Sequence, residues 1–264
     1  MMTSVFLKTI YDKRWFILGW MIGFAALTAL MVAFYPAMHQ DGSLDQLVKT
    51  MPPAFQGLVG DLSNLQQFST YLASQLFDIR ITIIGSVMVI ILALGLTVAE
   101  EESGQSRTLL SLPISRTKLF IQKWLAMVTV ITTTVVACAG SIYVMQITID
   151  ESIDHAVLWR LIAMTWLLLV TLGTIVFSLA IGTGNRAIAT GLGILVVAGS
   201  FILTTFSAGV DWLRDYEMAS LFYYFPAVDI AKTGATWEDV AILSGITLLA
   251  LILSWLNFRR RDIG

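Results

Sequence analysis

The sequence predicts an all-α membrane protein with six transmembrane helices in a single domain, residues 1–264, and with both termini in the cytoplasm. Composition is the first observation behind this prediction: 57% of the residues are hydrophobic, 13% are charged, and the mean hydropathy is +0.80. Such values lie outside the range of soluble domains. The second observation is a set of apolar runs, each near the roughly 20 residues that a spanning helix needs. The six runs cover residues 15–35, 79–99, 124–147, 157–181, 187–210 and 240–258.

Positive charge is distributed unequally between the segments that connect these runs. Eleven of the sixteen Lys and Arg residues fall on the side that holds both termini, and five fall on the other side. Because cytoplasmic segments carry the excess of Lys and Arg, this asymmetry predicts cytoplasmic termini. The larger group comprises Lys8, Lys13, Arg14, Arg107, Arg116, Lys118, Lys123, Arg186, Arg259, Arg260 and Arg261.

The first run, residues 15–35, is predicted to be a retained helix rather than a secretory signal. It is longer than the apolar part of a signal peptide, about 7 to 15 residues, and no A-x-A-like cleavage site closes it. Before it, apolar and charged residues alternate so that a short helix would carry an apolar stripe. Two interpretations fit this segment: a short elbow helix lying in the inner membrane interface, and an ordinary charged flank that anchors the first span. The apolar residues are Val5, Phe6, Ile10 and Tyr11.

Two external segments have their own patterns. In residues 36–78, apolar residues recur at helical spacing before and after Pro52-Pro53, which predicts two short helices on the outer face. In residues 211–239, an aromatic run at positions 223–225 precedes Pro226. Aromatic residues are favoured at the headgroup level, so this run fits an interfacial belt as well as a substrate-contact role.

Motifs for catalysis and nucleotide binding are missing from the sequence. There is no G-x-x-x-x-G-K-[ST] run to hold nucleotide phosphates, and the two histidines, His39 and His155, have no metal-ligand spacing. Cys138 is the only cysteine, so a cysteine-based metal site within one chain is excluded. The acidic run 100–102 departs from the E-E-x-x-x-R pattern of intramembrane proteases, because Ser106 stands where arginine is needed. We therefore expect no enzyme activity, metal or cofactor in this chain.

The cytoplasmic segment between the second and third runs, residues 100–123, is the most informative part of the sequence. It reads E-E-E-S-G-Q-S-R-T-L-L-S-L-P-I-S-R over residues 100–116. Apolar side chains in a polar connection need a partner, which is either lipid or protein. Pro113 is expected to end a short helix, and Ser115 is placed to cap the helix that continues into the third run. The apolar residues are Leu109, Leu110, Leu112 and Ile114.

This segment closely resembles the coupling segment of the permease subunits of ABC-type exporters. In that family an acidic run with glycine, followed by L-L-S-x-P-I-S-R, docks onto the ATPase subunit. The ending N-F-R-R-R-D-I, residues 257–263, is similar to the F-x-R-R-D-I tail of the same family, and residues 223–226 are similar to its outer loop. The resemblance covers the whole chain in topology, whereas the specific motifs cover the coupling segment and the tail.

The resemblance implies a permease subunit in the cell membrane, plasma or inner, of a prokaryote. Its expected partners are two ABC-type ATPase subunits, a second permease that is identical or homologous, and the lipid bilayer, without nucleic acid. ATP and Mg²⁺ would bind in the ATPase subunits. The cargo expected for an uncharged pathway is a hydrophobic or amphipathic compound. The alternatives are an intramembrane enzyme or processing factor, and a purely structural membrane anchor.

The resemblance also assigns roles to residues of the coupling segment. It implies polar positioning by the three acidic residues, a close turn at Gly104, and insertion of the apolar residues into a cleft of the ATPase. The residues expected to couple the chain to an ATPase are Glu100, Glu101, Glu102, Gly104, Leu109, Leu110, Leu112, Pro113, Ile114 and Arg116.

Small residues at i, i+4 spacing in the first and fifth runs let helices approach closely. Spans one and five form the interface between permeases in the family, so these residues are candidates for a dimer contact. Packing within one chain explains the same pattern equally well, because glycine is frequent in membrane helices. The candidates are Gly19, Gly23, Ala187, Ala189, Gly191 and Gly193.

Overall fold

The computed structural model of the chain describes residues 4–40, 67–102 and 115–260. Within these ranges every regular element is helical, and six helical segments are long and apolar enough to cross a membrane. The predicted all-α architecture with six spans is therefore confirmed. The six segments are Arg14–Pro36, Phe68–Glu102, Arg116–Thr148, His155–Thr183, Arg186–Phe206 and Trp237–Arg259.

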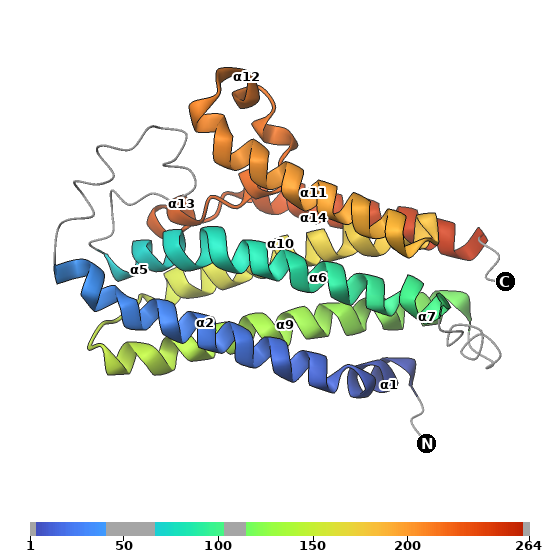
Figure 1. Cartoon of the computed structure of the whole chain (residues 1–264), viewed down its shortest axis with the longest axis horizontal. Coiled ribbons are helices and arrows are strands. Elements are labelled where there is room, and N and C mark those ends of the chain that lie inside the picture. The colour runs from blue at the N-terminus through green and yellow to red at the C-terminus, as the bar shows by residue number, and fades with distance from the viewer. Residues whose placement is uncertain (1–3, 41–66, 103–114, 261–264) are drawn as a thin grey trace.

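The spanning helices lie side by side and alternate in direction (Figure 1). They are α2 (Arg14–Gln40), the second span, α9 (Arg116–Thr148), α10 (His155–Thr183), α11 (Arg186–Phe206) and α14 (Trp237–Arg260). The second span runs through α5 (Phe68–Tyr71), η2 (Leu72–Ile81), α6 (Thr82–Leu96) and α7 (Val98–Glu102). The start of α2 and the end of α14 lie at the same end of the bundle, together with α7 and the first turns of α9 and α11. We call this the basic end, and the opposite end the far end.

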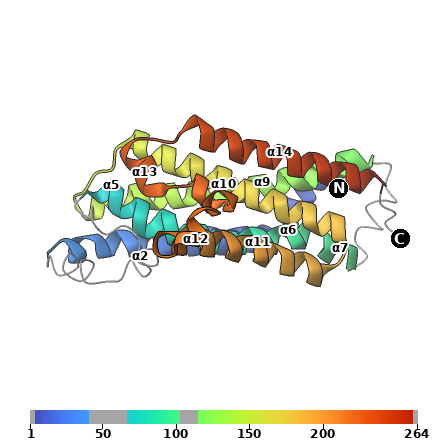
Figure 2. The same cartoon turned by 90° about the horizontal axis from the view of Figure 1, so that it is seen from above.

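Helix α10 is the centre of the bundle. It contacts α6, α9, α11 and α14, and Figure 2 shows it between α14 and α11. In the most apolar stretch of α10, 72% of the residues are buried inside the protein, against 17% in α2, α11 and α14. The latter three helices therefore turn most of their side chains outward, toward lipid or toward another protein.

The second span begins at Phe68, eleven residues before the start of the predicted run at residue 79. The predicted run starts at residue 79 because polar residues precede it. These polar residues nevertheless lie on a helix that packs against other parts of the protein. The segment Leu72–Ile81 is a π-helix that contacts α13 (Ala227–Lys232). Within this segment, Arg80 donates hydrogen bonds to the backbone carbonyl oxygen of Gln75 and to its Oε1. Hydrogen bonds of this kind lower the free-energy cost of burying polar groups, a cost that a hydropathy scale assigns in full.

Hydrogen bonds between side chains and neighbouring helices join several of the spans. Tyr71 donates its hydroxyl to the carbonyl oxygen of Met31 on α2 at 2.8 Å. Ser141 of α9 donates to the carbonyl oxygen of Ala25 at 2.8 Å. Other pairs are Thr28 with Cys138, 3.2 Å between Oγ1 and Sγ, and Thr171 with Thr247, 2.8 Å between the hydroxyl oxygens. Such bonds stabilise helix association in a membrane, where water offers no competing partner.

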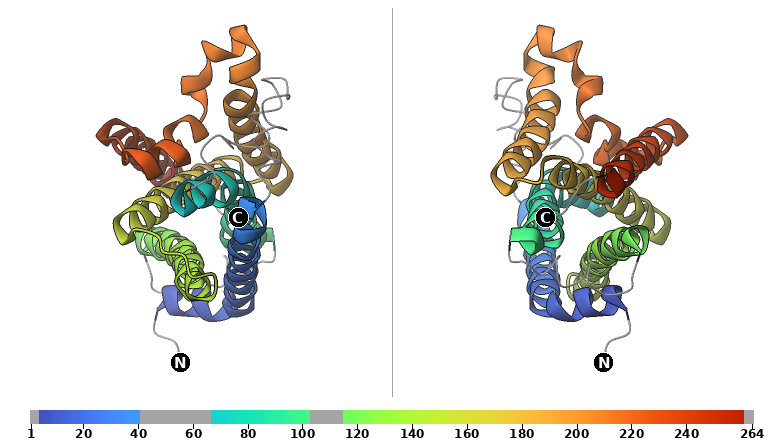
Figure 3. Two further views of the ribbon diagram at one scale, coloured as in Figure 1. Left: turned by 90° about the vertical axis from the view of Figure 1, so that its left-hand side faces the viewer. Right: turned by 90° about the vertical axis from the view of Figure 1, so that its right-hand side faces the viewer.

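A short helix at the N-terminus, α1 (Val5–Asp12), lies across the direction of the bundle (Figure 3). The helix contacts α9, with Val5 and Thr9 buried, whereas Tyr11 of the predicted stripe is exposed. Of the two interpretations left open for this segment, the structure therefore shows the short helix. Its position in the inner membrane interface stays a prediction.

The connection between α10 and α11 is two residues long. Gly184 ends α10 with a φ of 60°, a left-handed conformation that glycine adopts without steric cost. Asn185 then caps α11, because its Oδ1 accepts a hydrogen bond from the backbone N–H of Ile188 at 3.1 Å. The chain reverses direction here over a minimal length.

At the far end, short helical turns follow α11. They are η3 (Ser207–Gly209), α12 (Asp211–Arg214), η4 (Glu217–Ala219), η5 (Phe222–Tyr224) and α13. Ser220 ties this segment to α11 by donating to the carbonyl oxygen of Ser200 at 2.8 Å. In the aromatic run, Phe225 is a core residue and Tyr223 is exposed. The two helices predicted on either side of Pro52-Pro53 lie outside the described residues.

Candidate functional site

The candidate coupling segment is described only at its two flanks. Glu100, Glu101 and Glu102 lie on α7, and Arg116 begins α9. The remaining predicted coupling residues lie outside the described residues; they are Gly104, Leu109, Leu110, Leu112, Pro113 and Ile114. The structure therefore shows what holds the base of the segment.

Each flank is set by a local backbone feature. Helix α6 ends at Leu96, where Thr97 leaves the helical conformation with φ −121° and ψ −99°. Its hydroxyl donates to the carbonyl oxygen of Ala93 at 2.7 Å, and its own carbonyl oxygen accepts from the N–H groups of Glu100 and Glu101. On the other flank, Ser115 Oγ accepts from the backbone N–H of Lys118 at 3.3 Å. The predicted cap of α9 by Ser115 is confirmed.

A buried ion pair joins the two flanks. The Nζ atom of Lys123 on α9 lies 2.8 Å from Oε2 of Glu100 on α7, and the two side chains are 7% and 14% exposed. Burying both charges is costly, so the pair is weak evidence for stability as such. Removing one partner, in contrast, is strongly destabilising, because the remaining charge stays buried without its counter-charge. The pair therefore fixes α7 against α9 at the base of the segment.

The pairing of Glu100 with Lys123 was missed in the sequence, where both residues were assigned to the segment separately. A signal for it exists. Glu100 directly follows the second predicted run and Lys123 directly precedes the third, so antiparallel packing of these two spans brings the opposite charges to the same depth. A second, weaker link runs from α7 to α11, where Glu102 Oε2 and Arg186 Nη1 are 3.8 Å apart on exposed side chains. Exposed pairs of this kind contribute about 0–1 kcal/mol.

From α9, hydrogen bonds continue into the bundle. Trp124 Nε1 donates to Thr174 Oγ1 of α10 at 3.0 Å. Farther along the same interface, Trp166 Nε1 of α10 donates to Thr132 Oγ1 at 2.8 Å. Helix α14 is joined to the first turn of α9 as well, through Trp255 Nε1 and Thr117 Oγ1 at 3.2 Å. A displacement of α9 would therefore be carried to α10 and α14.

The candidate dimer residues separate into two groups. Gly19 and Gly23 of α2 are exposed, and a Cβ atom added at either would meet nothing within 4 Å. Ala187 and Gly191 of α11 are exposed too. In contrast, Ala189 and Gly193 are buried within the chain. At Gly193 an added Cβ would lie 3.3 Å from Val176 Cγ2 on α10.

This separation bears on an alternative that the spacing left open for α11. The pattern at residues 189 and 193 serves packing inside the chain, whereas the pattern at residues 187 and 191 faces outward. The outward patterns on α2 and α11 stay candidates for a contact between permeases.

Within the described ranges no three His, Cys, Asp or Glu side chains are grouped closely enough to hold a metal ion. His155, at the start of α10, forms a hydrogen bond between its Nδ1 and the hydroxyl of Tyr143 at 3.0 Å. Cys138 is buried in contact with Thr28.

A comparison with known families finds a match over nearly the whole chain. Residues 6–263 match the sequence profile of the family described as ABC-2 family transporter protein. A search of curated proteins finds no significant match.

Proposed function

The chain belongs to the ABC-2 transporter family, and we propose that it is the membrane subunit of an exporter whose ATP is hydrolysed by a separate subunit. Family membership makes the chain a membrane component of an ABC transporter, and such a component works with an ATPase subunit. The finer proposal is an assembly with two ATPase subunits and a second permease. Its location would be the plasma or inner membrane of a prokaryote.

The ion pair between Glu100 and Lys123 is the observation that carries this proposal. A coupling segment must pass the movement of an ATPase to the spans, and a loose connection would absorb that movement. The pair ties together α7 and α9, the two helices from which the segment extends, at 2.8 Å. Because α9 is hydrogen-bonded to α10 and α14, a push on the segment acts on the bundle core. ATP-dependent association of the ATPases would then bias a two-state change of the spans.

The cargo proposed is a hydrophobic or amphipathic compound. The central windows of the six spans carry few charged residues, whereas paths for ions or protons usually contain them. Export is the direction that the coupling motif supports through its resemblance to exporter permeases.

Docking on the ATPase is tested by Leu109→Glu and Leu110→Glu. We expect either change to leave membrane insertion intact and to abolish co-purification with the cognate ATPase, because a carboxylate cannot enter an apolar cleft without a large desolvation cost. Ser106→Glu adds the same charge at a polar position of the segment and serves as the matched control. Wild-type co-purification and ATPase stimulation by the leucine variants would refute the docking role.

The proposed orientation is tested separately by labelling. The two termini share one end of the bundle, and we propose that this end is cytoplasmic. Single cysteines are introduced as Ser43→Cys and Ser106→Cys in a Cys138→Ser background, which keeps a hydroxyl beside Thr28. An impermeant reagent added outside should label position 43 alone, and labelling of position 106 would reverse the orientation.

A further inference from the structure

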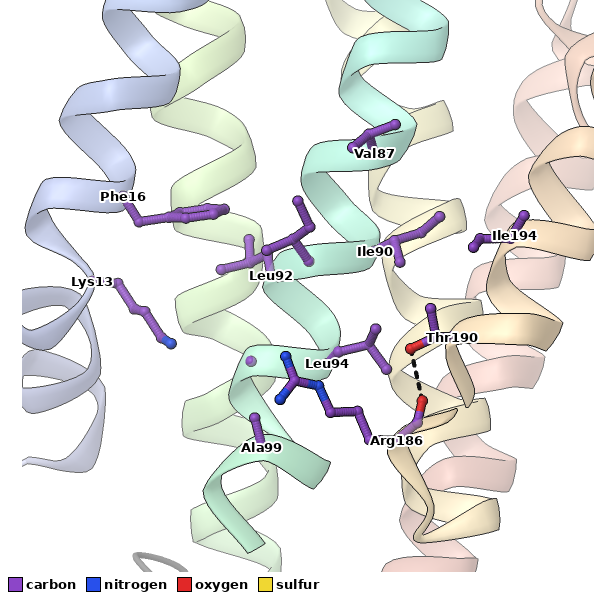
Figure 4. Close-up of a pocket in the computed structure, with 12 residues that line it drawn as sticks. Lys13, Phe16, Val87, Ile90, Leu92, Leu94, Ala99, Arg186, Thr190 and Ile194 are labelled. Atoms are coloured by element: carbon purple, nitrogen blue, oxygen red, sulfur yellow. Dashed lines mark hydrogen bonds between the residues drawn. The ribbon is translucent and has the colours of Figure 1, made fainter. Parts of the chain in front are cut away.

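A groove of about 640 Å³ opens at the basic end between α2, α6 and α11. Its volume lies within the range of small-molecule sites. Two cationic side chains, Lys13 and Arg186, line it together with a mostly apolar wall (Figure 4). The apolar wall includes Phe16, Val87, Ile90, Ile91, Leu94 and Ile194.

The two cations enter the groove from opposite sides. Figure 4 shows both side chains extending toward the end of α6. The Lys13 ammonium lies over Gly95, where an added Cβ would be 3.2 Å from Nζ. In the described part of the chain, Lys13 has neither an ion pair nor a hydrogen bond from its ammonium group, and Arg186 has only the 3.8 Å contact with Glu102. The groove therefore keeps a net positive charge.

The depth of these groups fits the membrane boundary. Lys13 directly precedes the first span, and Arg186 is the first residue of the fifth. Ile194 lies eight residues farther along α11, about 12 Å deeper at about 1.5 Å per residue. Positive charge at the headgroup level followed by an apolar channel is the complement of an anionic lipid.

We propose that this groove binds an anionic phospholipid of the leaflet at the basic end. The phosphate accepts hydrogen bonds from Lys13 and Arg186, since ammonium and guanidinium groups pair strongly with phosphate oxygens. One acyl chain lies along Ile90, Ile91 and Ile194. Basic pockets between spans are suited to anionic headgroups in this way. The proposal concerns binding of the lipid to the permease chain itself, so its test requires neither the ATPase nor transport.

The test is native mass spectrometry of the purified full chain titrated with palmitoyl-oleoyl phosphatidylglycerol, with phosphatidylcholine as the neutral comparison. We expect Lys13→Gln combined with Arg186→Gln to weaken phosphatidylglycerol binding about 30-fold, equivalent to about 2 kcal/mol for two cations near the headgroup. Lys8→Gln combined with Lys118→Gln is the matched control. It removes the same charge from exposed residues at the same end. Equal losses in the two double variants would show general surface attraction and overturn the proposal.

A second variant tests the acyl chain without altering charge. Ile194→Trp should fill the groove and lower phosphatidylglycerol binding, whereas Ile202→Trp, exposed on the same helix but outside the groove, should not. Displacement of the lipid by inorganic phosphate, with no effect of Ile194→Trp, would indicate a simple anion site and refute lipid binding. Loss of permease dimers in the groove variants with unchanged lipid binding would assign the groove to a protein contact and also refute it.

Discussion

Helices α9 and α11 are both long enough to span a membrane, but they are attached to the bundle in different ways. Helix α9 is hydrogen-bonded to α2, α10 and α14 and is joined to α7 by a buried ion pair. In the described residues, the side-chain hydrogen bonds from α11 to other elements are those that Ser200 and Thr204 make with the segment at residues 220–221. Elsewhere α11 rests on close packing, as at Gly193, and on the exposed Glu102–Arg186 pair. On the proposed coupling route, movement entering at α7 would therefore pass more directly to α9 than to α11.

The two ion pairs of α7 give the largest expected contrast. Glu100→Gln leaves the buried Lys123 ammonium without its counter-charge and should lower the free energy of unfolding by about 3 kcal/mol. Glu102→Gln removes the exposed contact to α11 and should change it by less than about 0.5 kcal/mol. Unfolding of the purified chain in detergent, monitored by circular dichroism, measures both values.

A double variant shows whether the loss comes from the unpaired charge. Glu100→Gln with Lys123→Met removes both charges and should recover most of the stability, because neutral replacement of a buried pair is often nearly neutral in free energy. Equal destabilisation by Glu100→Gln and Glu102→Gln would remove the difference between α9 and α11 at this end.

Packing gives the second contrast, on α11 alone. Gly193→Leu forces a side chain against Val176, because even an added Cβ would lie 3.3 Å from its Cγ2, and overpacking should cost about 1–3 kcal/mol. At Gly191, two residues away and exposed, an added Cβ would meet nothing within 4 Å, so Gly191→Leu should leave the unfolding of the isolated chain almost unchanged. The unfolding midpoints of the two variants are compared in one detergent. A larger loss at position 191 would mean that α11 turns its other face toward the bundle.

The hydrogen bond between Trp124 and Thr174 gives the smallest expected effect. In a double-mutant cycle, Trp124→Phe and Thr174→Val should show a coupling free energy of about 0.6 kcal/mol, typical of such bonds between spans. Thr190→Val on α11 is the matched comparison, because Thr190 Oγ1 donates only to the carbonyl oxygen of Arg186 on its own helix. Its combination with Trp124→Phe should be additive. A coupling near zero between Trp124 and Thr174 would weaken the proposed path from α9 to α10.

The sequence predicted the six spans because each carries an apolar run, and residues such as Ser115 could be assigned to a cap from their local context. It could not predict features that depend on the neighbour of a side chain. The second span extends back to Phe68 because polar groups such as Arg80 find partners on the helix itself. The pairing of Glu100 with Lys123 depends on the reversal between two spans. The choice between Gly191 and Gly193 depends on the rotation of α11, which identical spacing does not reveal.

The two-residue connection at Gly184 and Asn185 has a geometric consequence for any tilting of α11. Helix α11 extends from this connection over 21 residues, about 30 Å at about 1.5 Å per residue. A tilt of about 5° about the connection would displace its far end by about 2.6 Å, and Ile194, about 12 Å from the pivot, by only about 1 Å. The amplitude grows with distance from the pivot. Such a tilt would thus widen the space between α11 and its neighbours at the far end while the volume beside Arg186 and Thr190 stays nearly constant.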